Sequence, residues 1–281
     1  MSTDKRSRVR LAIVLVPLAL LYLGACTVKH APLPAGYIPK MHNLNPGDEQ
    51  FGRRLYRNLC EDYQSTAQHQ KYDQLVEAFD HIKQAAQVDH IPWQLHLFAD
   101  PERVDIRAVH GNYIFVWSGL LDVVAGEDEI AALLADEMAH VLAGHTLPVE
   151  YTIWSEVFFQ AAELSTTIAI MTLSHGMVAI GGSGWMKWAY TEAADLDPLD
   201  RVYNNADERE AAQIALLIIA RTKYSPAAML AFWKRVEENR DLEKKTKQLQ
   251  RNLSPQKRVT MLEELLPKLQ EQAEHISGQQ G

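Results

Sequence analysis

Residues 127–146, EDEIAALLADEMAHVLAGHT, decide how this chain folds. The apolar residues of the stretch recur at helical spacing: Ile130, Leu133, Leu134, Val141 and Leu142. Glu127, Asp128 and Glu129 place negative charge on the first turn, where the dipole of a helix favours it. We therefore predict a buried helix here, around which the rest of the domain is organised.

The same stretch carries a possible catalytic motif. Residues four apart project from one side of a helix, so Asp136 and His140 face the same way with Glu137 beside them. In the zinc-peptidase signature H-E-x-x-H, two side chains at this spacing hold the metal, and the glutamate is the general base acting on a metal-bound water. Here Asp136 replaces the first histidine. Taken alone, D-E-x-x-H is also compatible with a solvated acidic turn of a helix. The motifs around it must therefore decide between a catalytic motif and such a turn.

The N-terminus has the proportions of a signal peptide. Four basic residues precede the apolar run Leu11–Leu23, which at 13 residues is shorter than the ~20 that a membrane-spanning helix needs. Leu23-Gly24-Ala25-Cys26 then resembles the lipobox of bacterial lipoproteins, in which Cys26 is lipidated and becomes the first residue. Thr27 after this cysteine favours the outer membrane, facing the periplasm. An uncleaved signal anchor is the alternative.

Composition describes the rest of the chain as an ordinary globular protein. The 281 residues are 47% hydrophobic and 23% charged, enough for one sizeable core. The formal net charge of −8 becomes about −11 without residues 1–25, which makes nucleic acid an improbable partner. Cys60 has no second cysteine to pair with after Cys26, and we expect a buried thiol there.

The pattern of elements predicts an α+β fold that is mainly helical. Residues 26–46 are rich in proline and form a tether, and the folded domain should span 47–275, with 276–281 as a disordered tail. Helices are expected near 46–59, 72–87, 154–173, 206–222, 226–240 and 255–275, and strands near 93–98, 104–109 and 112–118. A small sheet thus precedes the central helix, and a glycine-rich stretch, Gly176–Gly184, follows it.

Several motifs appear in a fixed order around the central helix. Gly111–Leu121, GNYIFVWSGLL, precedes the helix, and Asp207–Ala212, DEREAA, and Tyr224–Ala228, YSPAA, follow it. With Glu127–His145, this order resembles the gluzincin zinc metallopeptidases of peptidase family M48, a group that includes HtpX, BepA and LoiP. The resemblance covers roughly residues 45–265 and implies a metallopeptidase-like domain with a small sheet and an active-site helix.

The resemblance also assigns roles to particular residues. Glu137 would be the general base, and His140 and Glu208 would be ligands of one zinc ion, with Asp136 in the place of the first ligand. The strand residues Ile114, Phe115, Val116 and Trp117 would form the edge that pairs with an extended peptide. An ordinary core strand is the other interpretation of these four residues.

Three departures from the family pattern affect the same site. Asp136 replaces a histidine, and Ala212 replaces the aspartate of E-x-x-A-D that typically orients that histidine. Asn252-Leu253 stands where the family has a His-Pro pair ahead of Arg258. His145 should face away from the Asp136–His140 side of the helix and be structural, whereas the positions of His110 and His175 are not fixed by the sequence.

Two functions from different classes follow. The first is a lipid-anchored periplasmic zinc endopeptidase that acts on envelope proteins through a metal-activated water. The second is a pseudo-peptidase without zinc, which binds extended peptides or unfolded envelope proteins in a chaperone-like manner. Retention of Glu137, His140 and Glu208 favours the first, and the three concerted departures, at Asp136, Ala212 and Asn252-Leu253, favour the second.

Overall fold

The computed structural model describes residues 36–44, 46–146, 199 and 202–278, with side chains up to Leu269. These residues belong to one compact unit formed by Pro32–Leu147 and Leu199–Gly281. The lipobox at Cys26, the expected helix at 154–173, the glycine-rich stretch and His175 lie outside the described residues. No helix in the described part of the chain is both long and apolar enough to cross a membrane.

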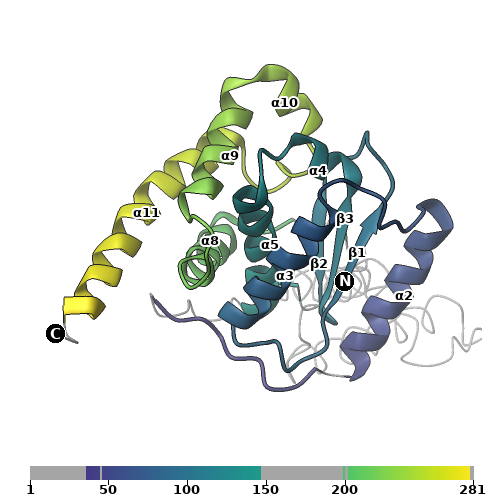
Figure 1. Cartoon of the computed structure of the whole chain (residues 1–281), viewed down its shortest axis with the longest axis horizontal. Helices are drawn as coiled ribbons and strands as arrows, with labels where there is room; N and C mark the ends of the chain where they lie inside the picture. Colours follow the sequence, from purple (N-terminus) through teal and green to yellow (C-terminus); the bar gives the residue numbers. More distant parts are fainter. Residues whose placement is uncertain (1–35, 45, 147–198, 200–201, 279–281) are drawn as a thin grey trace, which may run out of the picture. The chain divides into compact units, whose positions relative to one another are not determined.

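The predicted α+β class is confirmed, because many helices surround one small sheet (Figure 1). The N-terminal half contains α2 (Pro46–Asp62), α3 (Tyr72–Ala85), β1 (Gln94–Phe98), β2 (Ile106–Val109), β3 (Tyr113–Trp117), α4 (Ser118–Val123) and α5 (Glu127–Leu142). The C-terminal half contains α8 (Asn205–Ile219), α9 (Ala227–Glu238), α10 (Arg240–Lys245) and α11 (Pro255–Gly278). The last helix thus ends at a glycine, three residues beyond its expected end at His275.

The strand order corrects one prediction. The sheet runs β1-β3-β2, with β1 parallel and β2 antiparallel to β3. Ile114, Phe115, Val116 and Trp117 therefore lie in the central strand, whose backbone groups already pair on both sides, and they cannot form an edge for a peptide. All five residues of β3 are buried, as expected of a strand covered on both faces.

Side chains of β3 alternate between two apolar layers. Tyr113, Phe115 and Trp117 belong to an aromatic cluster that α2 covers, and Ile114 and Val116 belong to the main core with α3 and α5 (Figure 1). The position of β3 between these layers explains its continuous apolar sequence.

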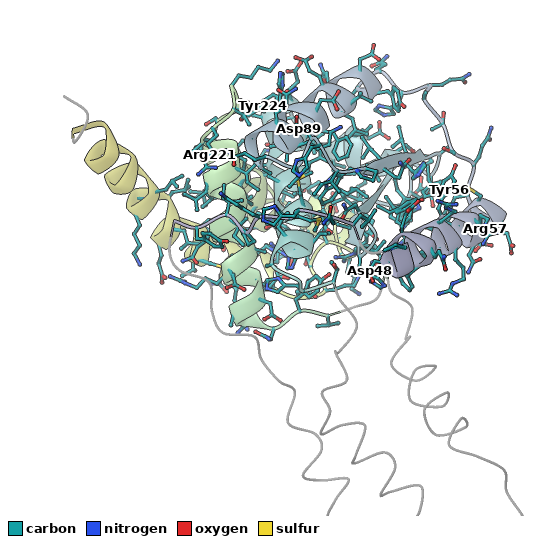
Figure 2. All side chains as sticks on the ribbon, turned by 90° about the horizontal axis from the view of Figure 1, so that it is seen from below. Asp48, Tyr56, Arg57, Asp89, Arg221 and Tyr224 are labelled. Atoms are coloured by element: carbon teal, nitrogen blue, oxygen red, sulfur yellow. The ribbon has the colours of Figure 1, made fainter. Side chains whose placement is uncertain are left out.

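Helix α2 lies close to the sheet because it carries a glycine at the contact. A Cβ atom on Gly52 would overlap the ring of Tyr113. Two aromatic residues of α2 stack on histidines: Phe51 on His110, with ring centroids 3.7 Å apart, and Tyr56 on His96, at 3.8 Å (Tyr56 is labelled in Figure 2). Leu59 takes the buried position of the last turn, so Cys60, about 100° further round the helix, is exposed. The expected buried thiol was wrong.

Helix α5 is the central buried helix that the sequence predicts. Every residue from Glu129 to Leu142 is buried. At its start, the carboxylate of Glu129 accepts a hydrogen bond from the Ala125 amide at 2.7 Å and pairs with Arg235. At its end, Gly144 adopts a positive φ of 76°, which turns the chain out of the helix.

Helix α8 begins with a capping box. The Asn204 side chain accepts hydrogen bonds from the amides of Ala206 and Asp207, and the Asp207 carboxylate accepts one from the Asn204 amide. This cap fixes the first turn of α8, which contains Glu208.

Candidate functional site

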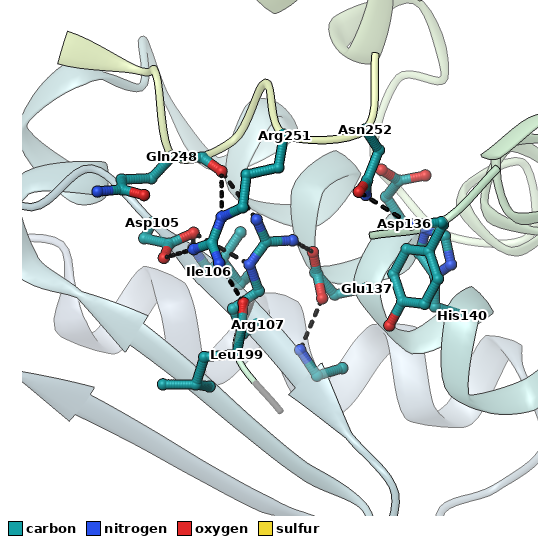
Figure 3. A network of polar contacts seen from close by, with 12 residues as sticks. Asp105, Ile106, Arg107, Asp136, Glu137, His140, Leu199, Gln248, Arg251 and Asn252 are labelled. Carbon is teal, nitrogen blue, oxygen red and sulfur yellow. Dashed lines mark hydrogen bonds and ion pairs between the residues drawn. The ribbon is translucent and has the colours of Figure 1, made fainter. Parts of the chain in front are cut away.

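Helix α5 presents Asp136, Glu137 and His140 toward its neighbours β2 and α8 (Figure 3). All three side chains are buried, with residue exposures of 6%, 8% and 2%. A charged group removed from water in this way requires a partner of opposite charge or a hydrogen bond. The partners therefore define what the site can do.

Glu208 on α8 reaches the same place. Its Oε1 atom lies 3.6 Å from His140 Nε2, and the residue is completely buried. The structure thus brings together two residues that the family motifs paired across a long stretch of sequence. Their roles as zinc ligands stay a prediction.

The cation in this site is Arg258, from the first turn of α11. Its Nη1 donates a hydrogen bond to Asp136 Oδ2 at 3.1 Å, and its Nη2 lies 2.6 Å from Glu208 Oε2. One guanidinium therefore bridges Asp136, in the position of the family's first zinc ligand, and Glu208, in the position of the third. The sequence held a signal for it, since Arg258 interrupts the apolar stripe that continues through Leu262 and Leu265.

Burial dominates the ionisation of these groups. It raises the pKa of Asp136 and of Glu208 above their ordinary values, although Arg258 opposes both shifts. Burial, followed by the charges of nearby groups, holds the pKa of His140 well below its usual range, so this imidazole is neutral. Burial lowers the pKa of Arg258, but Glu208 and Asp136 together raise it and keep the guanidinium charged.

Glu137 bonds to the sheet edge. Its Oε2 atom accepts a hydrogen bond from the Ala108 amide at 2.6 Å, and its Oε1 atom lies 3.7 Å from Arg107 (Figure 3). Burial raises the pKa of Glu137 to about 8 despite Arg107. At neutral pH this carboxyl group retains its proton in most molecules.

A second ionic cluster surrounds Asp105. Asp105 is completely buried and pairs with three arginines: Arg103 at 2.8 Å, Arg251 at 2.9 Å and Arg107 at 3.4 Å. Arg107 also donates to the Gln248 carbonyl, and Arg251 to that of Leu199 (Figure 3). This cluster attaches the segment before α11 to β2.

His145 is placed differently from the prediction. It was expected to face away from His140, but its Nδ1 lies 3.0 Å from His140 Nδ1, and its Nε2 lies 3.0 Å from Glu210. The helix ends at Leu142, so the direction expected for a side chain on a continuous helix does not apply to His145. Tyr203, which the sequence did not single out, stacks on His140 with centroids 4.0 Å apart.

The other two changed positions also belong to this region. Asn252 donates from Nδ2 to Glu208 Oε1 at 2.6 Å and accepts from the Tyr203 amide at 3.0 Å, so it lies at the site as its alignment implied (Figure 3). Ala212 is completely buried on α8, one turn after Glu208. An alanine offers no acceptor that could orient an imidazole.

The side chains as they are placed do not fit a zinc ion. Zinc requires several nitrogen, sulfur or oxygen ligands around one point at ~2.0–2.3 Å. Asp136 and Glu208 instead direct oxygens at a guanidinium, and the described residues contain no group of three His, Cys, Asp or Glu arranged to hold a metal. In this arrangement Arg258 balances the negative charge of Asp136 and Glu208.

A small sheet beside a helix with D-E-x-x-H, completed by a glutamate from a second helix, defines a metallopeptidase-like domain. The model of peptidase family M48 matches residues 69–275, and the chain belongs to this family. Its members are normally zinc-dependent metallopeptidases. The predicted family is thus confirmed, whereas the comparisons do not assign the chain to the HtpX, BepA or LoiP group.

Known relatives include mitochondrial metalloendopeptidases. The chain is 28% identical to OMA1 of Schizosaccharomyces pombe over 184 residues, 64% of this chain and 48% of that protein. It is 27% identical to OMA1 of Saccharomyces cerevisiae over 150 residues, 53% of this chain and 38% of that protein. Against OMA1 of Danio rerio the identity is 26% over 207 residues, 72% and 42% of the two chains. The chain therefore spans less than half the length of these relatives.

Proposed function

We propose that this chain is a non-hydrolytic member of peptidase family M48, lipid-anchored in a bacterial envelope, that holds extended segments of other polypeptides. The observation that carries the proposal is the guanidinium of Arg258, which bonds both Asp136 and Glu208. In the endopeptidase alternative, these two carboxylates would have to turn toward a metal. Here they are neutralised from within the chain.

The state of Glu137 supports the absence of hydrolysis. A general base needs a free carboxylate near the pH at which it works. The Oε2 atom of Glu137 already accepts a hydrogen bond from the Ala108 amide at 2.6 Å, and its Oε1 atom lies 3.7 Å from Arg107. A carboxylate held by a sheet amide and an arginine is not free to accept a proton from water.

Polypeptide binding is proposed at the outer edge of β2. The Trp117 amide donates to the Asp105 carbonyl, so backbone groups of Ile106 and Ala108 alternate outward, away from β3. The Ala108 amide meets Glu137 at this edge, on the side where β2 faces α5. The outward amides of Ile106 and Ala108 already donate to Asp105 and Glu137, so an extended segment at this edge would bond to the two carbonyls.

The location follows from residues 1–26 and is part of the proposal. Changing Cys26→Ala should leave the protein without lipid and move it from the membrane fraction to the soluble periplasm. The measurement is fractionation of cells expressing each form, with detection by immunoblot. A Cys26→Ala protein that remains wholly in membranes would support the signal anchor instead.

The decisive test combines metal analysis with two assays on the full-length protein in detergent. We expect substoichiometric zinc, no chelator-sensitive cleavage of unfolded casein, and slower aggregation of the casein in the presence of the protein. The double variant Asp136→His with Ala212→Asp restores the ligand and its orienting partner and should gain zinc. One zinc per wild-type chain, with casein cleavage that Glu137→Gln abolishes, would establish the endopeptidase alternative.

A further inference from the structure

Residues 36–44, called the strap below, lead into α2 (purple in Figure 1). The sequence assigned them to the proline-rich tether, but the structure packs them on the domain. Ile38 is 8% exposed and belongs to the main core, and Met41 packs against that core. The Asn112 side chain also donates to Met41 Sδ at 3.5 Å. The strap is therefore part of the folded body, and only residues 27–35 are left to connect it to the proposed lipid anchor.

Backbone geometry defines both ends of the strap. Gly36 has a positive φ of 81°, so the chain turns as it enters the strap. At the other end, a Cβ atom on Gly111 would lie only 2.1 Å from the Asp48 carbonyl oxygen, so the start of α2 rests directly on the turn between β2 and β3. The point at which the tether leaves the domain is thus fixed.

Two side chains of the strap are exposed. Tyr37 is 43% exposed, and in the described part of the chain only Val202 is another large hydrophobic residue with such exposure. Lys40 is exposed as well and forms no ion pair with any residue that the structure describes. Tyrosine, with a ring and a hydroxyl group, is enriched at the level of lipid headgroups, and lysine is attracted to anionic headgroups. The exposed side of the strap therefore has the chemistry of a membrane-surface contact.

The charge of the N-terminal region differs from that of the rest of the chain. The formal net charge of the whole chain is −8, yet no acidic residue occurs between Asp4 and Asp48. Lys29 and Lys40 lie within this stretch. An anionic lipid surface repels the acidic remainder of the protein and attracts these lysines. The region nearest the proposed anchor is therefore the region whose charge fits such a surface.

The length of the tether keeps the strap close to the membrane. The ten steps from Cys26 to Gly36 can reach at most about 35 Å, which is less than the diameter of about 40 Å expected for a domain of this size. A tether this short gives the strap an effective concentration on the order of millimolar at the bilayer. Weak contacts made by two side chains then suffice for docking.

We propose that the strap is a membrane-docking surface. In this arrangement Tyr37 enters the headgroup layer of the bilayer that holds the anchor, and Lys40 pairs with anionic phospholipid headgroups. The proposal rests on the lipid anchor of the proposed function and deepens it. A docked domain holds its polypeptides beside the bilayer, whereas an undocked domain moves through the full length of its tether.

The test measures the height of the domain above vesicles by fluorescence energy transfer. The full-length lipidated protein is reconstituted into vesicles of three parts phosphatidylethanolamine to one part phosphatidylglycerol, with acceptor dyes on the headgroups. The donor dye is attached to Cys60, which is exposed on α2, whereas lipidation occupies the thiol of Cys26. A flexible insertion of glycine and serine after Pro34 lengthens the tether without altering the strap.

In the wild type the insertion should leave the energy transfer unchanged, because the docked strap sets the height. The pair Tyr37→Ser with Lys40→Glu should lower the transfer about twofold, and the insertion should lower it further, since the released domain moves through the length of its tether. Tyr37→Phe with Lys40→Arg is the matched control, which keeps the ring and the charge and should behave like the wild type. Both pairs change exposed side chains, so their melting temperatures should equal that of the wild type.

The opposite result is an energy transfer that falls with the insertion as much in the wild type as in the Tyr37→Ser, Lys40→Glu protein. It would overturn the inference, because the domain would then hang on its tether. The proposed anchor fails on a different readout, namely lipid-free protein that does not float with the vesicles. Polypeptide holding is tested separately by the casein assays, whatever the height of the domain.

Discussion

Two regions of the domain are packed by different chemistry, and they meet where Arg103 stacks on Trp117. Between α2 and the sheet lies a layer of stacked rings, in which Tyr56 and Phe51 rest on two histidines. Around α5, α8 and the segment before α11 lies an ionic layer, in which four buried carboxyl groups, that of Glu137 protonated at neutral pH, meet four arginines: Asp105, Asp136, Glu137 and Glu208 with Arg103, Arg107, Arg251 and Arg258. The stability of an aromatic layer depends on how well its side chains fill the available volume. The stability of an ionic layer depends on each charge having a partner.

The difference determines which substitutions each layer tolerates without loss of the fold. A volume-conserving change in the aromatic layer leaves its neighbours satisfied. A neutralising change in the ionic layer leaves a buried charge without its partner, even when the shape is kept. The replacement of a histidine by Asp136 is compatible with folding because Arg258 supplies the opposite charge.

The largest effect is expected from Asp105→Asn. The amide keeps the shape of the side chain but leaves Arg103, Arg107 and Arg251 around a neutral group, at a cost of about 3–5 kcal/mol in the free energy of unfolding. Urea titration monitored by circular dichroism measures this loss. The control is Asp122→Asn on the surface, which should change stability by less than ~0.5 kcal/mol. Equal values for both variants would show that the ionic layer does not depend on pairing.

Glu137→Gln should remove a pH dependence from the ionic layer. The folded pKa of about 8 lies above the ordinary 4.5, so between these values the folded state holds the proton more strongly, and stability falls as the pH rises. Between pH 6 and pH 8 the wild type should lose about 2.5 kcal/mol relative to Glu137→Gln. Urea midpoints at both pH values test this, with Glu61→Gln on the exposed face of α2 as control. Parallel pH profiles would contradict the raised pKa.

Gly52→Ala should disrupt the aromatic layer by volume alone. Alanine is normally the better helix residue by about 1 kcal/mol, but here its Cβ meets the ring of Tyr113. We expect a net destabilisation of about 2 kcal/mol, typical of overpacking. The double variant with Tyr113→Leu provides the control, since a smaller side chain should recover part of the loss. A stabilised Gly52→Ala protein would show that α2 can move away from the sheet without cost.

The smallest effect is expected from His96→Phe, which keeps a ring under Tyr56. Burial lowers the pKa of His96 to about 4, so the unfolded state binds the proton more strongly between about pH 6.5 and 4, and stability falls as the pH falls. Between pH 6 and pH 5 the wild type should lose about 1 kcal/mol more than the variant, after allowance for partial solvent exposure. Exchange of the exposed His90 for Gln is the control. The ionic layer would then lose stability as the pH rises, and the aromatic layer would lose it as the pH falls. If both lost stability in the same direction, this distinction between the layers would fail.

The site shows how much a motif can determine. The positions of Asp136, Glu137 and His140 on one helix follow from spacing alone, and Glu208 follows from a second motif in the order that the family resemblance implies. The hydrogen-bond and ion-pair partners of each residue do not follow from the motifs. His145 was misplaced because the turn at Gly144 ends the helix, and Ile114–Trp117 was assigned to an edge because an apolar strand has the same local pattern at an edge facing a partner and in the centre.

The sequence by itself determined the family, the α+β class, the central helix and the identity of the changed ligand. These properties reside in local periodicity and in motif order, which are readable along the chain. The order β1-β3-β2 and the pairing of Arg258 with Asp136, across 122 residues, were decided only by the tertiary structure. Pairings of this kind depend on which distant segments are buried together, because only burial makes a charge require a particular partner.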